Sequence, residues 1–173
     1  MRRLIVVLVV VVALAGAYRH YASPTTGTGT LTLPPPAPAP GDDTPTFSAD
    51  RVEQRGAFVL SKQGTHVVAF WSRMNLNSER SEPHLRRLAE DFGGGDVRFA
   101  TIYIDGPPEV AVRRPYAVLR DENGSLSSLY NAKVVPRLFV VKDGTVRLTY
   151  DGSSPEGYSE VRETLEELGP PPS

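Results

Sequence analysis

The chain has 173 residues and a formal net charge of −1, from 19 Lys and Arg residues and 20 Asp and Glu residues. The charges are mixed along the chain and form no basic stripe, which argues against a nucleic-acid partner. The absence of cysteine excludes thiol–disulfide exchange, thiol-based peroxide reduction, lipid attachment to cysteine and cysteine-based zinc sites.

The first 22 residues have the pattern of an export signal. Two arginines precede an apolar run over residues 4–17, and Ala15-Gly16-Ala17 offers a small-x-small cleavage site. We expect residues 1–22 to be either a cleaved signal peptide or a signal anchor in the inner membrane through residues 4–21. The remainder is then extracytoplasmic, in the periplasm or at the cell surface.

A linker and a tail flank one predicted domain. Residues 23–46 are rich in Pro, Thr and Gly and contain too little apolar surface to fold, so they predict an extended spacer rather than a proline-rich ligand. We expect the folded domain to cover residues 47–168 and residues 169–173 to form a disordered tail.

Apolar patterns within this domain predict helices and strands in alternation. The run over residues 66–71 is β-branched and aromatic, follows Gly64 and is too short for an ordinary buried helix, so it indicates a central strand. The predicted elements, in chain order, are a hairpin over 47–60, a strand over 66–71, a helix over about 78–92, a strand over 97–104, a turn or two over 109–114, a short helix over 125–130, a hairpin over 134–150 and a last helix over 155–168.

Capping and turn residues support three of these elements. Asn75, Asn77 and Ser78 are candidate N-cap residues for the first helix. The Lys-Asp-Gly sequence at 142–144 is a strong hairpin signal. Ser154, followed by a proline at the first helical position, starts the last helix.

The segment from Phe70 to Pro83 resembles the active-site segment of extracytoplasmic thioredoxin-like proteins of the TlpA type. In that family the segment runs Phe-Trp-Ala-x-Trp-Cys-x-x-Cys, with a helix proline five residues after the second cysteine. Phe70, Trp71 and Pro83 match in place, whereas Asn75 and Ser78 take the two cysteine positions. The frame of the active site is present without its thiols.

A second motif extends the resemblance over residues 47–168. The stretch 134–144 is similar to the family's Gly-Val-Pro-Thr-x-Phe-Leu-Ile-x-x-Asp-Gly, whose proline is cis and lies against the active-site loop. The resemblance therefore implies an α/β fold, a thioredoxin-like central mixed sheet with flanking helices and an N-terminal β-hairpin, and a cis Val135–Pro136 peptide. One departure is the stretch 105–115, which leaves room only for a stunted element.

The resemblance implies five site residues, none of them catalytic. Asn75 and Ser78 are vestigial active-site positions, which either bind an anion, a thiol or a carbonyl group at a helix N-terminus or simply cap the helix. Val135 and Pro136 form a predicted groove for an extended segment of a partner protein, unless Pro136 only shapes the loop. Trp71 either flanks that groove or lies in the core.

The favoured function is a redox-inactive, exported or membrane-tethered adaptor or chaperone in extracytoplasmic protein maturation. One alternative is a thiol-independent enzyme, such as a glutathione-transferring activity through Ser78, and another is a thiol-disulfide oxidoreductase of this family that has lost its redox chemistry. Another is a structural protein that supports a complex through Glu163, Glu166 and Glu167. No cofactor is expected.

The histidines do not have the spacing of a metal site. They are scattered over the predicted anchor flank, a strand and a helix, at His20, His66 and His84. Because metal binding needs convergent ligands, no metal is expected.

Overall fold

The computed structural model describes residues 35–53, 55–106 and 113–169. The predicted export signal (1–22), most of the predicted turn over 109–114 and residues 170–173 of the predicted tail lie outside these ranges. The described elements are β1 (Phe47–Asp50), β2 (Ala57–Leu60), β3 (Thr65–Trp71), α2 (Leu76–Phe92), β4 (Val97–Tyr103), β5 (Ala117–Arg120), α3 (Ser125–Leu129), β6 (Arg137–Lys142), β7 (Thr145–Asp151) and α4 (Pro155–Leu168).

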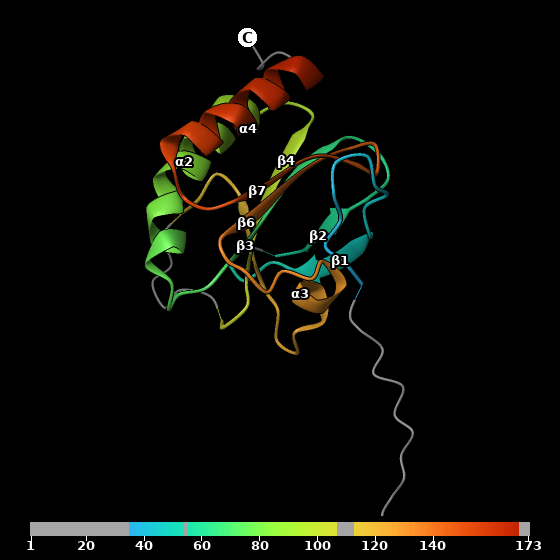
Figure 1. Cartoon of the computed structure of the whole chain (residues 1–173). Coiled ribbons are helices and arrows are strands. Elements are labelled where there is room, and N and C mark those ends of the chain that lie inside the picture. The colour runs from blue at the N-terminus through green and yellow to red at the C-terminus, as the bar shows by residue number, and fades with distance from the viewer. Residues whose placement is uncertain (1–34, 54, 107–112, 170–173) are drawn as a thin grey trace, which may run out of the picture. The chain divides into compact units, whose positions relative to one another are not determined.

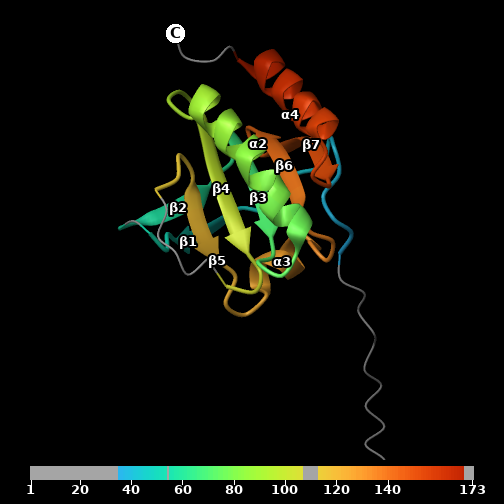
Figure 2. The same ribbon diagram turned by 90° about the vertical axis from the view of Figure 1, so that its left-hand side faces the viewer.

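The centre of the domain is a mixed sheet of five strands in the order β5-β4-β3-β6-β7. β3, β4 and β5 are parallel, whereas β6 is antiparallel to both β3 and β7. A separate antiparallel hairpin, β1–β2, precedes the sheet. The predicted mixed sheet with an N-terminal hairpin is confirmed (Figure 2).

Strand β3 is buried along its whole length and supplies side chains to both faces of the sheet. Val67, Ala69 and Trp71 pack in the cluster that includes α2 and α4 side chains. Val68 and Phe70 pack in the cluster with β2 and with Tyr130, which follows α3. Burying a large apolar side chain contributes about 1.5–3 kcal/mol, which explains why this strand is apolar on both faces.

Helices α2 and α4 therefore cover one face, and the hairpin with α3 covers the other. The two long helices lie side by side in both views (Figures 1 and 2). Arg162 of α4 ion-pairs with Asp91 of α2, and its guanidinium carbon lies 5.5 Å from the ring centroid of Phe92. This contact fixes α4 beside α2.

The Lys-Asp-Gly hairpin signal is confirmed. Asp143 and Gly144 have φ angles of 50° and 79°, the two positive values that a two-residue turn with right-handed strand twist requires. Asp143 Oδ1 also accepts a hydrogen bond from the backbone N–H of Gly64 (2.9 Å). The turn is thereby joined to the loop that enters β3.

The predicted start of the first helix is two residues too late. α2 begins at Leu76, with Asn75 as its N-cap, rather than near Ser78. Phe70, Trp71 and Pro83 have the positions that the resemblance implies, because β3 ends at Trp71 and Pro83 lies inside α2.

The linker predicted over residues 23–46 extends too far. Pro38 is buried, the Gly41 N–H donates to the carbonyl of Val146 (2.9 Å), and the Thr44 N–H donates to the carbonyl of Gly144 (2.7 Å). The physical reason is that β7 is an edge strand, whose unpaired backbone groups need partners. The end of the proline-rich segment supplies them and belongs to the folded domain.

In the described ranges no helix has the length and apolar character to cross a bilayer. The predicted anchor over residues 4–21 lies outside those ranges and stays a prediction.

We predict that Gly157→Ala destabilises the protein, although alanine favours helices by about 1 kcal/mol. A Cβ on Gly157 would lie 2.0 Å from Cε2 of Tyr150. That ring is held by a hydrogen bond from the Ser154 N–H (2.7 Å) and by edge-to-face contact with Tyr158 (5.4 Å). Overpacking should lower the free energy of unfolding by about 1–2 kcal/mol in urea denaturation.

The matched control is Glu160→Ala, an exposed change in the same helix, which should alter stability by less than about 0.5 kcal/mol. In a Tyr150→Ala background the clash is absent, so Gly157→Ala should become stabilising. Destabilisation of equal size in both backgrounds would contradict the proposed clash.

Candidate functional site

Asn75 connects the start of α2 to the loop that enters β6. Its backbone is extended at the N-cap position, and its Oδ1 accepts a hydrogen bond from the Asn77 N–H (2.8 Å). Its Nδ2 donates to the backbone carbonyl of Val135, also at 2.8 Å. The Asn75 amide thus uses both its acceptor and a donor, and it brings together segments that are 60 residues apart in the sequence.

The Val135–Pro136 peptide bond is cis, as the resemblance implies. Pro136 is buried, and the Val135 side chain packs on the cluster of Phe70 and Phe139. The Val135 carbonyl is occupied by Asn75. The Val135 N–H, in contrast, has no hydrogen-bond partner among the described residues.

Ser78 is buried rather than presented to solvent. Its side chain and backbone are 2% exposed, and its Oγ accepts a hydrogen bond from the Ser72 N–H (3.2 Å). No His, Asp or Glu side chain hydrogen-bonds to this hydroxyl in the part of the chain that the structure describes. Since a serine nucleophile needs an adjacent base, the geometry is that of a structural hydroxyl.

Trp71, which the sequence places either beside the groove or in the core, is a core residue. It is 1% exposed and meets the rings of Tyr103 and Tyr116 edge to face, at centroid distances of 5.9 and 6.3 Å. The structure therefore brings Asn75 and Val135–Pro136 together, with Trp71 and Ser78 beneath the surface beside them.

Asp105 is a site residue that the sequence does not reveal. Its carboxylate accepts hydrogen bonds from the Ser72 hydroxyl (2.7 Å) and from the N–H groups of Arg73 (2.9 Å) and Met74 (3.2 Å). These three residues form the loop between β3 and α2. A signal does exist, because β3 and β4 are parallel and Trp71 pairs with Tyr103, so the loops after both strands meet at one edge of the sheet.

The hydrogen bonds to Asp105 favour its ionised form. Partial burial opposes ionisation and is the largest single effect, but the bonds from the Arg73 N–H, the Ser72 hydroxyl and the Met74 N–H together lower the pKa of this carboxyl below its ordinary value of 3.8. Asp105 is therefore a fixed negative charge that holds the loop at neutral pH.

Three exposed apolar residues are sequence neighbours of the hydrogen-bonded pair Asn75 and Val135. Met74, Leu76 and Val134 are 86%, 67% and 58% exposed, which makes them the most exposed large apolar residues among those that the structure describes. Met74 and Leu76 flank Asn75 at the start of α2, and Val134 precedes Val135. We call Met74, Leu76 and Val134 the apolar rim.

A pocket of about 410 Å³ lies behind the loop and is lined by Trp71, Ser78, Glu82 and Tyr103, among others. Burial raises the pKa of Tyr103 to about 12. Burial, with the nearby Glu82 carboxylate, raises the pKa of Tyr116, whose hydroxyl donates to Glu82 Oε1 (3.0 Å). Both phenols are protonated hydrogen-bond donors at neutral pH.

The composition of the chain excludes thiol–disulfide exchange at this site. The chain has no thiol, and the described residues contain no group of three His, Cys, Asp or Glu side chains that would hold a metal ion. What the site does offer is a backbone N–H at Val135, the apolar rim and a rigid frame of hydrogen bonds.

Comparisons of the structure identify the fold. The chain resembles a putative thiol:disulfide interchange protein DsbE from Chlorobium tepidum, with a TM-score of 0.67 and 22% identity over 77% of this chain and 100% of the other. It also resembles the exposed lipoprotein thioredoxin Etrx1 from Streptococcus pneumoniae (TM-score 0.60, 20% identity, 72% and 100% coverage). A third neighbour is StoA from Bacillus subtilis, with a TM-score of 0.57 and 14% identity over 70% of this chain and 96% of the other.

The fold is thioredoxin-like. At these identities the likeness extends to the fold alone, and the expected α/β class with flanking helices and a hairpin is confirmed. No protein-family model and no curated protein sequence matches the chain.

We predict that Asn75→Ala lowers the free energy of unfolding by about 1–2 kcal/mol, because it removes a helix cap and the donor to Val135. Asn75→Asp keeps the cap acceptor but faces the Val135 carbonyl with a carboxylate oxygen. Its free energy of unfolding should therefore fall measurably, but by less than that of Asn75→Ala. Urea denaturation is the measurement. Asn77→Ala, an exposed neighbour, serves as the control, and equal stability of Asn75→Ala and Asn77→Ala would refute the bridging role.

We predict that Asp105 makes the stability of the folded protein more sensitive to low pH. Its folded-state pKa lies below its unfolded-state value near 3.8, so its contribution to stability is complete above that value and is lost as pH falls through the lower folded-state pKa. Melting temperatures measured from about pH 5 to pH 2.5 should fall less steeply in Asp105→Asn than in the wild type. Asp96→Asn, an exposed change before β4, should show the same dependence of melting temperature on pH as the wild type. If Asp105→Asn also follows the wild-type curve, Asp105 does not contribute to the loss of stability in acid.

Proposed function

We propose that this chain is a redox-inactive thioredoxin-like protein of the TlpA type, which binds an extended segment of a partner protein beside Pro136. It acts as an adaptor or chaperone in extracytoplasmic protein maturation. The observation that supports the proposal is the hydrogen bond from Asn75 to the Val135 carbonyl, because it joins the two segments that carry the exposed residues of the apolar rim.

The backbone at Val135 supports recognition of an extended chain. A peptide that adds to a backbone edge gains affinity from main-chain hydrogen bonds and specificity from pockets for its side chains. The Val135 N–H is available to a peptide carbonyl. The Val135 carbonyl already receives Asn75, but a carbonyl oxygen has two lone pairs and accepts a second donor.

The apolar rim indicates which chemistry the partner should have. Exposed apolar side chains that gather on one site mark an interaction surface, whereas scattered ones do not. Methionine at position 74 adds a flexible, polarisable contact that adapts to different apolar partners. The favoured partner is thus an unfolded or extended segment that carries apolar residues, as maturing exported proteins do.

The N-terminal region supports a location outside the cytoplasm, at the end of a tether. Residues 1–22 have the export pattern described above, and the folded domain begins near Pro38. The spacer would then cover residues 23–37, which at about 3.1–3.4 Å per residue reach roughly 50 Å when extended. The domain would work close to the membrane surface if the signal is retained as an anchor.

The geometry does not favour the enzyme alternative. Glutathione activation through Ser78 needs an accessible hydroxyl and a base, but Ser78 is 2% exposed and accepts a backbone hydrogen bond. The structural alternative depends on Glu163, Glu166 and Glu167, which are exposed on α4. Because they are exposed, substitutions at these glutamates can serve as controls in the binding experiment that tests the groove.

The test is binding of fluorescently labelled, reduced and carboxymethylated α-lactalbumin, a chain that stays unfolded and has no free thiol, measured by anisotropy. Met74→Glu and Val134→Glu should each weaken binding by at least about fivefold, the loss of roughly 1 kcal/mol expected of an important contact. Val59→Glu changes an apolar residue of similar exposure (42%) on the hairpin and should leave affinity unchanged.

Equal weakening by Val59→Glu, or no binding by the wild type, would remove the groove from the proposal. Weakening only by Glu163→Lys and Glu167→Lys would favour the structural role of α4 instead.

A further inference from the structure

His66 is a buried histidine on the central strand β3, on the face of the sheet that the β1–β2 hairpin covers. It is 1% exposed. It shares this face with Val68 and Phe70, because side chains two positions apart on a strand point to the same side. The ring of Phe58, on β2, meets its imidazole edge to face at a centroid distance of 6.1 Å. Strand β2 therefore packs directly on this histidine.

Neither ring nitrogen of His66 has a hydrogen-bond partner among the described residues. A neutral imidazole has one N–H donor, whereas a protonated imidazole has two. The backbone of Val59 lies close enough to favour the proton. Because a buried charge costs free energy unless it is paired and hydrogen-bonded, the packed hairpin favours the neutral ring.

The charged groups that act on His66 come from two elements. Arg98 pairs with it in register on the parallel strand β4, and Asp143 lies in the turn between β6 and β7. Burial is the largest effect, and together with the Arg98 guanidinium it lowers the pKa of His66 below its ordinary value of 6.5. The Val59 backbone and the Asp143 carboxylate oppose this shift. Strand β2 and the facing residue of β6, Val141, are uncharged.

The hairpin is joined to the sheet mainly at its turn. The Val52 N–H donates to the Val118 carbonyl (2.9 Å), and Glu53 ion-pairs with Arg114 (2.6 Å). Among the described strands β2 pairs only with β1. Apolar side chains, Phe58 among them, therefore hold β2 on the sheet.

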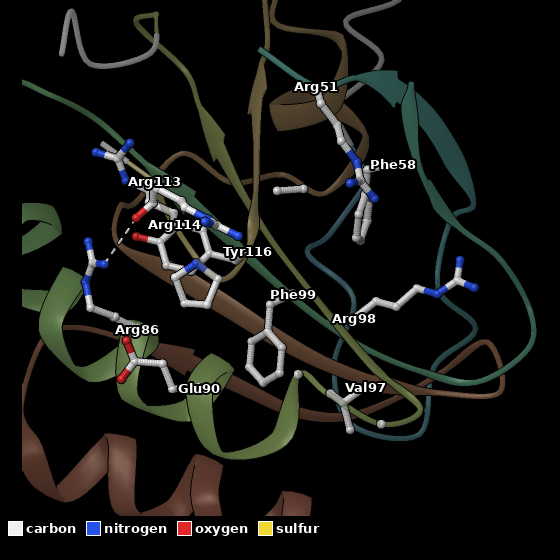
Figure 3. Close-up of a pocket in the computed structure, with 14 residues that line it drawn as sticks. Arg51, Phe58, Arg86, Glu90, Val97, Arg98, Phe99, Arg113, Arg114 and Tyr116 are labelled. Atoms are coloured by element: carbon white, nitrogen blue, oxygen red, sulfur yellow. Dashed lines mark hydrogen bonds between the residues drawn. The ribbon is translucent and has the colours of Figure 1, made fainter. Parts of the chain in front are cut away.

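A cavity of about 620 Å³ at the start of β4 is lined in part by Phe58 and Arg98. Figure 3 shows these two residues on one side of β4 and Phe99 on the side of α2. At Phe58 the hairpin thus borders open space, whereas β3 is paired with β4 and β6 along its length. Of the two elements that meet at His66, the hairpin is the one that can move away.

We propose that His66 is a proton-sensitive switch, in which a proton on its imidazole displaces the β1–β2 hairpin from the sheet and exposes the side chains of Phe58 and Leu60. The proton adds a second N–H donor and a positive charge next to Arg98. Movement of the hairpin lets water solvate this charge. The switch is independent of the proposed protein-binding groove.

The direction of the pKa shift sets the pH range of the switch. Once the hairpin has moved away, His66 takes up a proton near its ordinary pKa of 6.5, whereas beneath the hairpin it does so only at lower pH. The packed hairpin is therefore fully favoured above about pH 6.5 and is less favoured as pH falls toward the lower pKa. One pH unit below 6.5, a single group can weaken the packing equilibrium by at most about tenfold.

The experiment is hydrogen–deuterium exchange of the full-length protein at about pH 7.5 and about pH 5.5, with protection factors corrected for intrinsic exchange. Protection of hairpin peptides should fall by about fivefold to tenfold at the lower pH. It should also stay at least about tenfold below that of β3 peptides and respond weakly to about 1 M urea, because a local opening exposes little surface.

Three variants test the role of the imidazole. His66→Gln has no titratable ring and should abolish the fall in hairpin protection. Arg98→Gln removes the nearby positive charge and should make the fall smaller. His84→Gln is the matched control, because His84 lies on α2 and stacks on Tyr158 (5.0 Å), so it should behave as the wild type does.

The proposal is overturned if hairpin protection does not fall, if it falls equally in His66→Gln, or if hairpin and β3 peptides have equal protection, since opening would then be global. Should His66→Gln fail to fold, the imidazole of the wild type is titrated by NMR. A midpoint for His66 at or above 6.5 would also overturn the proposal.

Discussion

The geometry of the site depends on one side chain, the amide of Asn75. It caps α2 through Oδ1 and holds the Val135 carbonyl through Nδ2. Both contacts are needed, because the helix N-terminus has backbone N–H groups without helical partners and the cis Val135–Pro136 loop faces it. A side chain that has only an acceptor, or only a donor, could make only one of these two hydrogen bonds. These two contacts fix the position of α2 relative to the Val135–Pro136 loop without a covalent link.

Polar groups organise the loop at which relatives of this type would have their thiols. Asp105 holds the Ser72–Met74 loop from below, and Ser78 accepts a hydrogen bond from the Ser72 N–H. A reactive thiol must be accessible to the disulfide that it attacks. A structural hydroxyl does not have to be accessible, and Ser78 is buried. The exposed apolar residues beside this loop are those of the apolar rim.

The proposed groove and the cavity of about 620 Å³ lie at opposite ends of the parallel strands. β3 and β4 end at Trp71 and Tyr103, near the loops of the proposed groove. The cavity lies at the start of β4, near Val97 and Phe99, and its α2 residues belong to later turns of that helix than Asn75 and Ser78 do. The two regions are therefore separate parts of the surface.

The sequence by itself determined the elements whose signals are local. The apolar run of β3, the Asp143–Gly144 turn and the cap of α4 are each decided by neighbouring residues, and the lack of cysteine excluded redox chemistry at once. The cis Val135–Pro136 peptide was expected only from the resemblance to the TlpA type, not from a local pattern. The local features were predictable because periodicity, turn chemistry and composition act over a few residues.

Only the tertiary structure decided which distant groups meet. The bond from Asn75 to Val135 joins residues 60 apart, and Asp105 lies more than 30 positions from the loop that it holds. The docking of residues 38–46 on β7 was missed because prolines and glycines suggest a spacer, whereas an unpaired edge strand recruits any backbone that reaches it. Pairing across a sheet depends on strand order, and no local pattern encodes that order.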